Sequence, residues 1–184
     1  ITDNQINSLK REIIMASKFN HPSILKYVGF NVFSLKEKFN GLESGELKPT
    51  LLMSYIPNHS LKKFITSKKS KWNDTTKLKV MIGIASGLSE MYANNVIHRD
   101  LKPDNILLNQ SFEPVICDLG CSRTYSSIEY LKMSDNVGTP IYMAPELYNT
   151  DYSPIYKYEV DSYSFGIILF QILTATPTNK IFPN

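Results

Sequence analysis

A chain of 184 residues with 42% hydrophobic residues has the length and apolar content of one domain with a buried core. Its 20 Lys and Arg residues against 17 Asp and Glu residues give a net charge of +3. This is too small for the basic stripe of a protein that binds nucleic acid or a membrane surface, so neither partner is expected. The two cysteines, Cys117 and Cys121, have no His near them for a zinc site and indicate a reduced, cytoplasmic protein.

The first predicted element is a helix that begins at Thr2 or Asp3 and runs to about Phe19. Apolar residues recur along it at helical spacing. Glu12, taken alone, is typical of a solvated charge on such a helix. Two strands are predicted next, over residues 24–33 and 50–56, with a polar loop over residues 34–49 between them.

Two more helices are predicted, over residues 60–67 and from Asn73 or Asp74 to residues 94–95. The longer one has an apolar stripe that predicts its buried face, and further apolar residues beside the stripe predict a largely buried helix. The residues of the stripe are Leu78, Met81, Ile82, Ala85, Leu88 and Tyr92, and those beside it are Val80, Ile84 and Met91. Gly83 and Gly87 would allow close packing on this helix.

The next stretch carries the chemistry: residues 98–105 read His-Arg-Asp-Leu-Lys-Pro-Asp-Asn. Asp-Leu-Gly at 118–120 and Ala-Pro-Glu at 144–146 follow in order. The pattern H-R-D-L-x-x-x-N marks the catalytic loop of protein kinases. The chain therefore resembles the serine/threonine protein kinases, most closely their tyrosine-kinase-like branch, over nearly its whole length.

The resemblance implies an α+β fold of the protein-kinase-like, two-lobe type, here truncated. Residues 1–56 would be the remnant of the small lobe, with helix C and two strands, and residues 57–184 the mainly helical large lobe. Residues 106–108 and 114–117 are expected to form two short strands. A helix containing Asp161 is expected to be wholly buried, because residues 165–173 are apolar on all sides.

The same resemblance implies ATP-dependent phosphorylation of protein Ser/Thr hydroxyls. Asp100 would orient the hydroxyl and accept its proton, and Lys102 would offset the charge of the transferred phosphoryl group. Asn105 and Asp118 would hold Mg²⁺ with hard oxygen ligands. Lys102 is typical of members that act on Ser/Thr, with dual specificity left open.

ATP contacts are implied around two segments of the chain. Met53 would lie behind the adenine, backbone groups of Tyr55 and Ile56 would bind its edge, and Leu107 would lie beneath it. Glu12 matches the acid that pairs with the ATP-binding lysine of the family.

Residues 121–143 resemble an activation loop. Arg99 would pair with a phosphorylated residue in this loop, and the spacing from Gly138 places Asp135 at that site, where its carboxylate could replace the phosphate. Ser134 is the alternative site, and a solvated acid at Asp135 is the other interpretation. Five further positions complete the loop and its supports. Thr139 would bond Asp100 and Lys102. Glu146 matches an acid that pairs in the family with an Arg far downstream, which is not among these 184 residues. His98, Leu119 and Asp161 would have structural roles.

Several family features are not found in these 184 residues. No glycine spacing gives G-x-G-x-x-G, and no Val-Ala-Ile-Lys-like strand precedes Glu12. No signal peptide opens the chain, and its start at Ile1 indicates a fragment or processed piece. We therefore expect this piece alone to transfer little or no phosphate. A non-catalytic, pseudokinase-like scaffold is the rival interpretation, while Ala-Pro-Glu disfavours an unrelated phosphotransferase.

Overall fold

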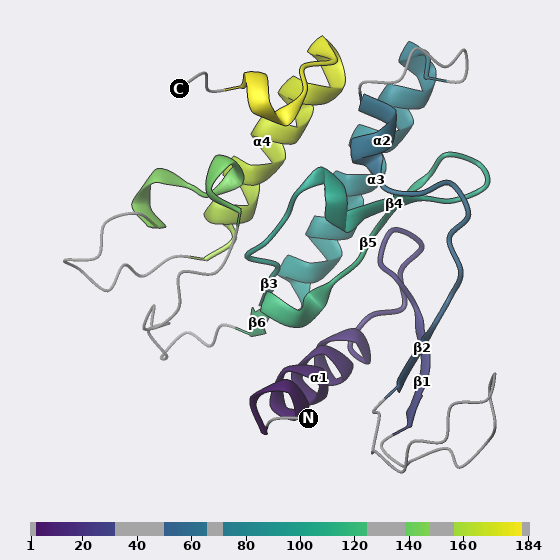
Figure 1. Cartoon of the computed structure of the whole chain (residues 1–184), viewed down its shortest axis with the longest axis vertical. Coiled ribbons are helices and arrows are strands. Elements are labelled where there is room, and N and C mark those ends of the chain that lie inside the picture. The colour runs from purple at the N-terminus through teal and green to yellow at the C-terminus, as the bar shows by residue number, and fades with distance from the viewer. Residues whose placement is uncertain (1–2, 32–49, 66–71, 125–138, 148–156, 182–184) are drawn as a thin grey trace, which may run out of the picture.

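The computed structural model describes residues 3–31, 50–65, 72–124, 139–147 and 157–181 (Figure 1). Within them, four α-helices and three two-stranded sheets confirm the expected α+β class. The helices are α1 (Asp3–Ala16), α2 (Leu61–Ile65), α3 (Asp74–Ala93) and α4 (Glu159–Thr174). The strands are β1 (Tyr27–Asn31), β2 (Thr50–Met53), β3 (Val96–Ile97), β4 (Ile106–Leu108), β5 (Pro114–Ile116) and β6 (Arg123–Thr124).

The sheets are small antiparallel pairs: β1 with β2, β3 with β6, and β4 with β5. Figure 1 shows α3 running behind the β3 and β4–β5 region, with α1 beside β6 and α4 on the opposite side. The segment before β1 pairs with β5, since Leu25 N–H donates to the Ile116 carbonyl and Ile116 N–H donates to the Ser23 carbonyl, both at 2.8 Å. The first part of the chain is thereby hydrogen-bonded to the strand that precedes Asp118.

Several predicted boundaries were too wide. The first helix ends at Ala16 and not near Phe19, because the chain closes into a tight turn in which the Ser17 hydroxyl donates to the Ile14 carbonyl at 2.9 Å. The first strand begins at Tyr27, since the residues before it pair with β5. The second strand ends at Met53 and not at Ile56. The predicted loop over residues 34–49 lies outside the described residues.

Helix α3 begins as predicted, with Asn73 at the N-cap and its side chain accepting the Thr76 N–H at 2.9 Å. Its glycines lie against β5. A Cβ atom at Gly83 would lie 2.4 Å from Pro114 Cγ, and one at Gly87 would lie 2.8 Å from Ile116 Cδ1. The predicted close packing is confirmed, because any larger side chain at these positions would displace β5.

The predicted buried face of this helix was only partly correct, since Leu88 is buried and Met81 and Tyr92 pack against the core. Leu78 and Ile82 are 53% and 61% exposed, whereas the side chains predicted to lie beside the stripe face the core. The buried residues of the helix are Val80, Ile84, Gly87, Leu88 and Met91. Two neighbouring apolar stripes run along α3, and the glycines bring the second one against β5.

Helix α4 is not wholly buried, contrary to prediction. Phe170 and Leu173 are exposed, while Ile168 and Ile172 lie in the core. Among the described residues α4 packs against α3 and against the turn at Pro140–Tyr142, and these neighbours cover only part of its surface. A polar set on the covered side, Asp161, Ser164 and Gln171, is buried as well.

One main core joins the four helices to the sheets. Its fully buried side chains include Ile84 and Met91 of α3, Ile116 of β5, and Leu119 after β5. None of the described helices has the length and apolar character needed to cross a lipid bilayer.

Candidate active site

The loop between β3 and β4 presents charged side chains on one side and buries the other. Leu101, Pro103 and Asn105 are buried, while Lys102 and Asp104 between them are partly exposed. The alternation is enforced by apolar contacts of Leu101 in the core and by a 3₁₀ turn at Pro103–Asn105. Because Leu101, Pro103 and Asn105 are buried, the loop presents Lys102 and Asp104 on its solvent-facing side.

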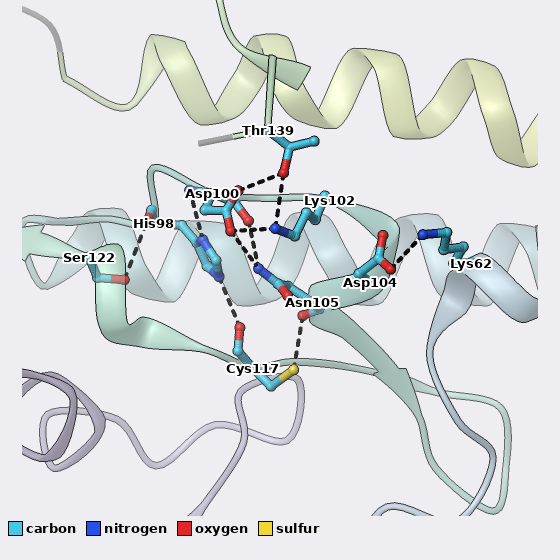
Figure 2. Close-up of polar contacts among 9 residues, drawn as sticks. All are labelled: Lys62, His98, Asp100, Lys102, Asp104, Asn105, Cys117, Ser122 and Thr139. Carbon is cyan, nitrogen blue, oxygen red and sulfur yellow. Dashed lines mark hydrogen bonds and ion pairs between the residues drawn. The ribbon is translucent and has the colours of Figure 1, made fainter. Parts of the chain in front are cut away.

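Asp100, Lys102, Asn105 and Thr139 form a connected polar cluster, called here the Asp100 cluster (Figure 2). Asp100 Oδ2 accepts from Lys102 Nζ at 2.7 Å and from Asn105 Nδ2 at 3.2 Å. The Thr139 hydroxyl donates to Asp100 Oδ1 at 3.2 Å and accepts from Lys102 Nζ at 3.0 Å. The Asp100 and Lys102 side chains are only 11% and 22% exposed, so this ion pair is poorly screened by water.

Asp161 of α4 holds the loop from behind. Its carboxylate accepts the backbone N–H of His98 at 2.7 Å and that of Arg99 at 2.9 Å. Burial raises the pKa of Asp161, while the nearby His98 and Arg99 side chains and these two N–H groups act against that rise. Arg99 has φ of 72°, a left-handed conformation that costs free energy in a residue other than glycine. The two bonds to Asp161 help to maintain this conformation.

His98 is buried between the loop and β5. Its Nδ1 accepts the Asp100 N–H at 3.3 Å, which leaves Nε2 to donate to the Cys117 carbonyl at 3.1 Å. The Ser122 hydroxyl donates to the His98 carbonyl at 3.4 Å. Figure 2 shows this ring spanning the gap between the Asp100 backbone and Cys117. His98 therefore ties the loop to the chain on both sides of Asp118.

Asp118 and Leu119 have opposite environments. Asp118 is exposed and left-handed, with φ of 63° and ψ of 73°, and no described residue forms a hydrogen bond or ion pair with its carboxylate. Leu119 is fully buried, in a 3₁₀ turn at Leu119–Cys121 that packs against α1.

Burial, together with the charges of Asp118 and Glu12, raises the pKa of the Cys117 thiol to about 12.

Glu12 lies on α1 and accepts a hydrogen bond from the Tyr27 hydroxyl of β1. Burial and the adjacent carboxylate raise the pKa of Tyr27. The three ion pairs found among the described residues do not include Glu12. Its partner in this structure is thus a neutral hydroxyl.

The predicted adenine contacts are spread over the connection after β2 and over β4. Tyr55 is 87% exposed, Met53 is exposed as well, and Ile56 and Leu107 are partly buried. A groove of about 310 Å³ lies beside Ile56. Its lining residues are Phe19, Asn20, His21, Pro22, Ile24, Lys26, Ser54, Ile56, Asn109 and Val115, which include none of the Asp100 cluster.

Several predicted positions are not brought into the cluster. Ser134 and Asp135 lie outside the described residues, so the predicted pairing with Arg99 is not observed there. Glu146 is exposed, in a 3₁₀ turn at Pro145–Leu147. No group of three or more His, Cys, Asp or Glu side chains within the described ranges is arranged to hold a metal by itself.

Three features of the site were not predicted: the bonds from α4 to Tyr142, the Lys62–Asp104 ion pair and the Tyr27–Glu12 bond. The Tyr142 hydroxyl donates to Gln171 Oε1 at 2.9 Å, and the Ser164 hydroxyl donates to the Tyr142 carbonyl at 2.6 Å, so α4 also holds the turn after Thr139. Lys62 of α2 pairs with Asp104 at 2.9 Å (Figure 2). The third is the Tyr27–Glu12 bond. Only the polar residues within apolar α4 gave a signal for any of them.

Comparisons with known proteins agree with this geometry. A family model described as "Protein kinase domain" matches residues 1–181. Similar relatives include a probable serine/threonine-protein kinase and RGS domain-containing serine/threonine-protein kinase A of Dictyostelium discoideum, 31% and 32% identical over 177 and 169 residues. A receptor protein kinase-like protein of Arabidopsis thaliana is 32% identical over 178 residues. These matches cover 95%, 92% and 90% of this chain but 17%, 13% and 22% of the relatives, so the chain spans less than a quarter of their length.

Proposed function

The chain belongs to the protein kinase domain family, and from this premise we propose that it carries the phosphoryl-transfer centre of a serine/threonine protein kinase. The observation that carries the proposal is the Asp100 cluster, in which a carboxylate and an ammonium group are held together by Thr139 and Asn105. Relatives named as serine/threonine-protein kinases support the acceptor class. The substrate is then a Ser or Thr hydroxyl of a protein, and the donor is ATP.

Asp100 is the proposed base. Its carboxylate accepts three side-chain hydrogen bonds within the cluster, and two carboxylate oxygens together offer about four lone-pair sites. One site therefore remains for the substrate hydroxyl. As the hydroxyl oxygen bonds to the γ-phosphorus, its proton passes to Asp100, and the bond from phosphorus to the bridging oxygen breaks so that ADP leaves with the electron pair.

Lys102 is proposed to offset charge on the transferred group. Its ammonium has three N–H donors, and two of them are used within the cluster, by Asp100 and Thr139. The third can reach a phosphoryl oxygen. In a loose transition state, this positioning and neutralisation of charge are the main contributions that a protein makes.

Asn105 and Asp118 fit a hard cation. Asn105 Nδ2 donates to the Asp100 carbonyl at 2.9 Å and to its carboxylate, which leaves the amide oxygen as an acceptor. The exposed Asp118 carboxylate is the second oxygen donor. Mg²⁺ binds through one or two carboxylates together with water and phosphate oxygens. When bound, it would neutralise charge on the phosphates of ATP.

The nucleotide contacts extend the proposal beyond the cluster. Backbone groups of Tyr55 and Ile56 are assigned to the adenine edge, with Met53 and Leu107 beside the ring and Glu12 on the phosphate side. Residues 1–56 then belong to a small lobe and residues 57–184 to a large lobe. Membership of the tyrosine-kinase-like branch rests on the sequence resemblance alone.

A second candidate function is a non-catalytic, pseudokinase-like interaction module. One observation favours it: these 184 residues contain no G-x-G-x-x-G loop. On either reading, we expect these residues alone to transfer little or no phosphate.

The deciding experiment uses the complete gene product that contains this chain. Transfer of label from ATP to a generic Ser/Thr substrate is measured for the wild type and Asp100→Asn, with Glu159→Gln as an exposed-acid control. We expect transfer that depends on Mg²⁺, is lost in Asp100→Asn and persists in the control. Mg²⁺-dependent transfer that survives Asp100→Asn would refute the assignment of the base, and no transfer at all would favour the interaction module.

A further inference from the structure

We propose that Tyr27 is a positioning residue that holds the Glu12 carboxylate toward the phosphate side of the nucleotide site and so sets the affinity for MgATP. This inference rests on the proposed function, because it assigns a role to Tyr27 in the same site. Its basis is the hydrogen bond from the Tyr27 hydroxyl on β1 to Glu12 Oε1 on α1. The bond links α1 to β1, two elements that also contact each other directly.

The pair is linked through α1 to the segment that carries the proposed metal ligand. The charges of Glu12 and Asp118 both act on the Tyr27 hydroxyl, and both act on the Cys117 thiol that precedes Asp118. The turn at Leu119–Cys121 packs against α1, and β1 contacts the same helix. A change in the position of α1 would therefore shift Asp118, because α1 contacts both the turn after Asp118 and β1.

The bond leaves Glu12 able to bind a cation. A carboxylate has two oxygens, and Tyr27 occupies only Oε1. Because the hydroxyl is neutral, it fixes the orientation of the carboxylate without cancelling its charge. Glu12 can thus present Oε2 to a positively charged partner that contacts the phosphates, while Tyr27 keeps the side chain from turning away.

The packing around the pair explains why a tyrosine fits here. Ala16 lies one turn after Glu12 on the same face of α1 and is only 4% exposed. The Tyr27 ring packs against the same core as Ala16. Because the ring is partly buried, its packing restricts the position of the hydroxyl that donates to Glu12.

The test is a double-mutant cycle in the complete gene product. MgATP affinity, KM and kcat are measured for the wild type, Tyr27→Phe, Glu12→Gln and the double variant. Tyr158→Phe is the matched control, because Tyr158 is an exposed tyrosine at the start of α4. We expect Tyr27→Phe to raise the KM for MgATP about tenfold, as loss of a hydrogen bond to a charged group would, with kcat changed less than about twofold. In the Glu12→Gln background, Tyr27→Phe should add little, because Tyr27 acts through Glu12.

A second measurement, hydrogen exchange, distinguishes a local change at α1 from a general loss of folding in the variants. Hydrogen exchange of the α1 amides should be faster in Tyr27→Phe than in wild type, while exchange in α3 should be unchanged. Equal affinity in Tyr27→Phe and wild type, or the same loss with and without Glu12→Gln, overturns the inference and leaves the proposed function standing. A wild type that neither binds MgATP nor transfers phosphate overturns the proposed function, and the inference with it.

Discussion

The carboxylate of Asp161 accepts the backbone N–H of His98 at 2.7 Å across 63 positions of the sequence. It accepts the Arg99 N–H as well, and the same helix holds the turn after Thr139 through Ser164 and Gln171. Helix α4 therefore fixes both sides of the Asp100 cluster. The distances among Asp100, Lys102 and Thr139 depend on these bonds from α4.

Replacement of Asp161 by Asn should weaken the fold and the site together. An Asn side chain has one carbonyl oxygen for two N–H groups, and its own NH₂ group would face a donor. We expect a loss of about 1–3 kcal/mol in the free energy of unfolding and a lower kcat. Urea unfolding and steady-state kinetics would measure both. Glu159→Gln, an exposed change on the same helix, should stay within about 0.5 kcal/mol of wild type, and an equally small effect of Asp161→Asn would contradict the anchoring role.

Thr139 should matter through its hydroxyl and not through its shape. Thr139→Val keeps the branched side chain but removes the bonds to Asp100 and Lys102. We expect kcat to fall by about tenfold to a hundredfold, the range for lost hydrogen bonds to charged groups, with little change in the KM for MgATP. Thr139→Ser should keep most of the activity. Equal rates for the Val and Ser variants would show that the hydroxyl has no such role.

Asp118→Asn should lower kcat by orders of magnitude, because a weaker oxygen ligand would hold Mg²⁺ less well at the phosphates. The left-handed backbone at this position is tolerated by Asn, so the fold should persist. The measurement is the rate as a function of Mg²⁺ concentration. An unchanged rate and an unchanged Mg²⁺ requirement would show that Asp118 is not a metal ligand.

Cys117 should react slowly with alkylating reagents at neutral pH. The thiolate is the nucleophile, and burial, with the charges of Asp118 and Glu12, raises the thiol pKa to about 12. Since a raised pKa keeps the thiol protonated until the pH approaches 12, labelling should increase with pH throughout the range from 7 to 10. Mass spectrometry after iodoacetamide treatment would compare the extent of Cys117 alkylation in the native protein with that in the urea-unfolded protein. Rapid labelling of the native form at pH 7 would contradict this environment.

The sequence predicted those parts of the site that are local in the chain. The spacing from Asp100 to Asn105 placed both residues in one loop, and Asn73 marked the start of α3. It did not predict which of two apolar stripes on α3 is buried, because Leu78 and Val80 are equally apolar and only the approach of β5 to Gly83 decides between them. The Tyr27–Glu12 bond was not predicted either, because neither residue type specifies a partner 15 positions away on another element.

The last prediction concerns packing at Leu119. This side chain is fully buried beneath α1, so Leu119→Ala should cost about 2–5 kcal/mol. We predict that Leu119→Phe instead keeps most of the activity, on the hypothesis that the small side chain of Ala16 on α1 leaves room for a larger ring. Ala16→Leu would fill the same room and should also be tolerated alone. The double variant should then be less stable than the sum of the two changes, since both side chains would compete for one space. Thermal unfolding of the four proteins measures this, and a large fall in Tm for Leu119→Phe alone would mean that no such room exists.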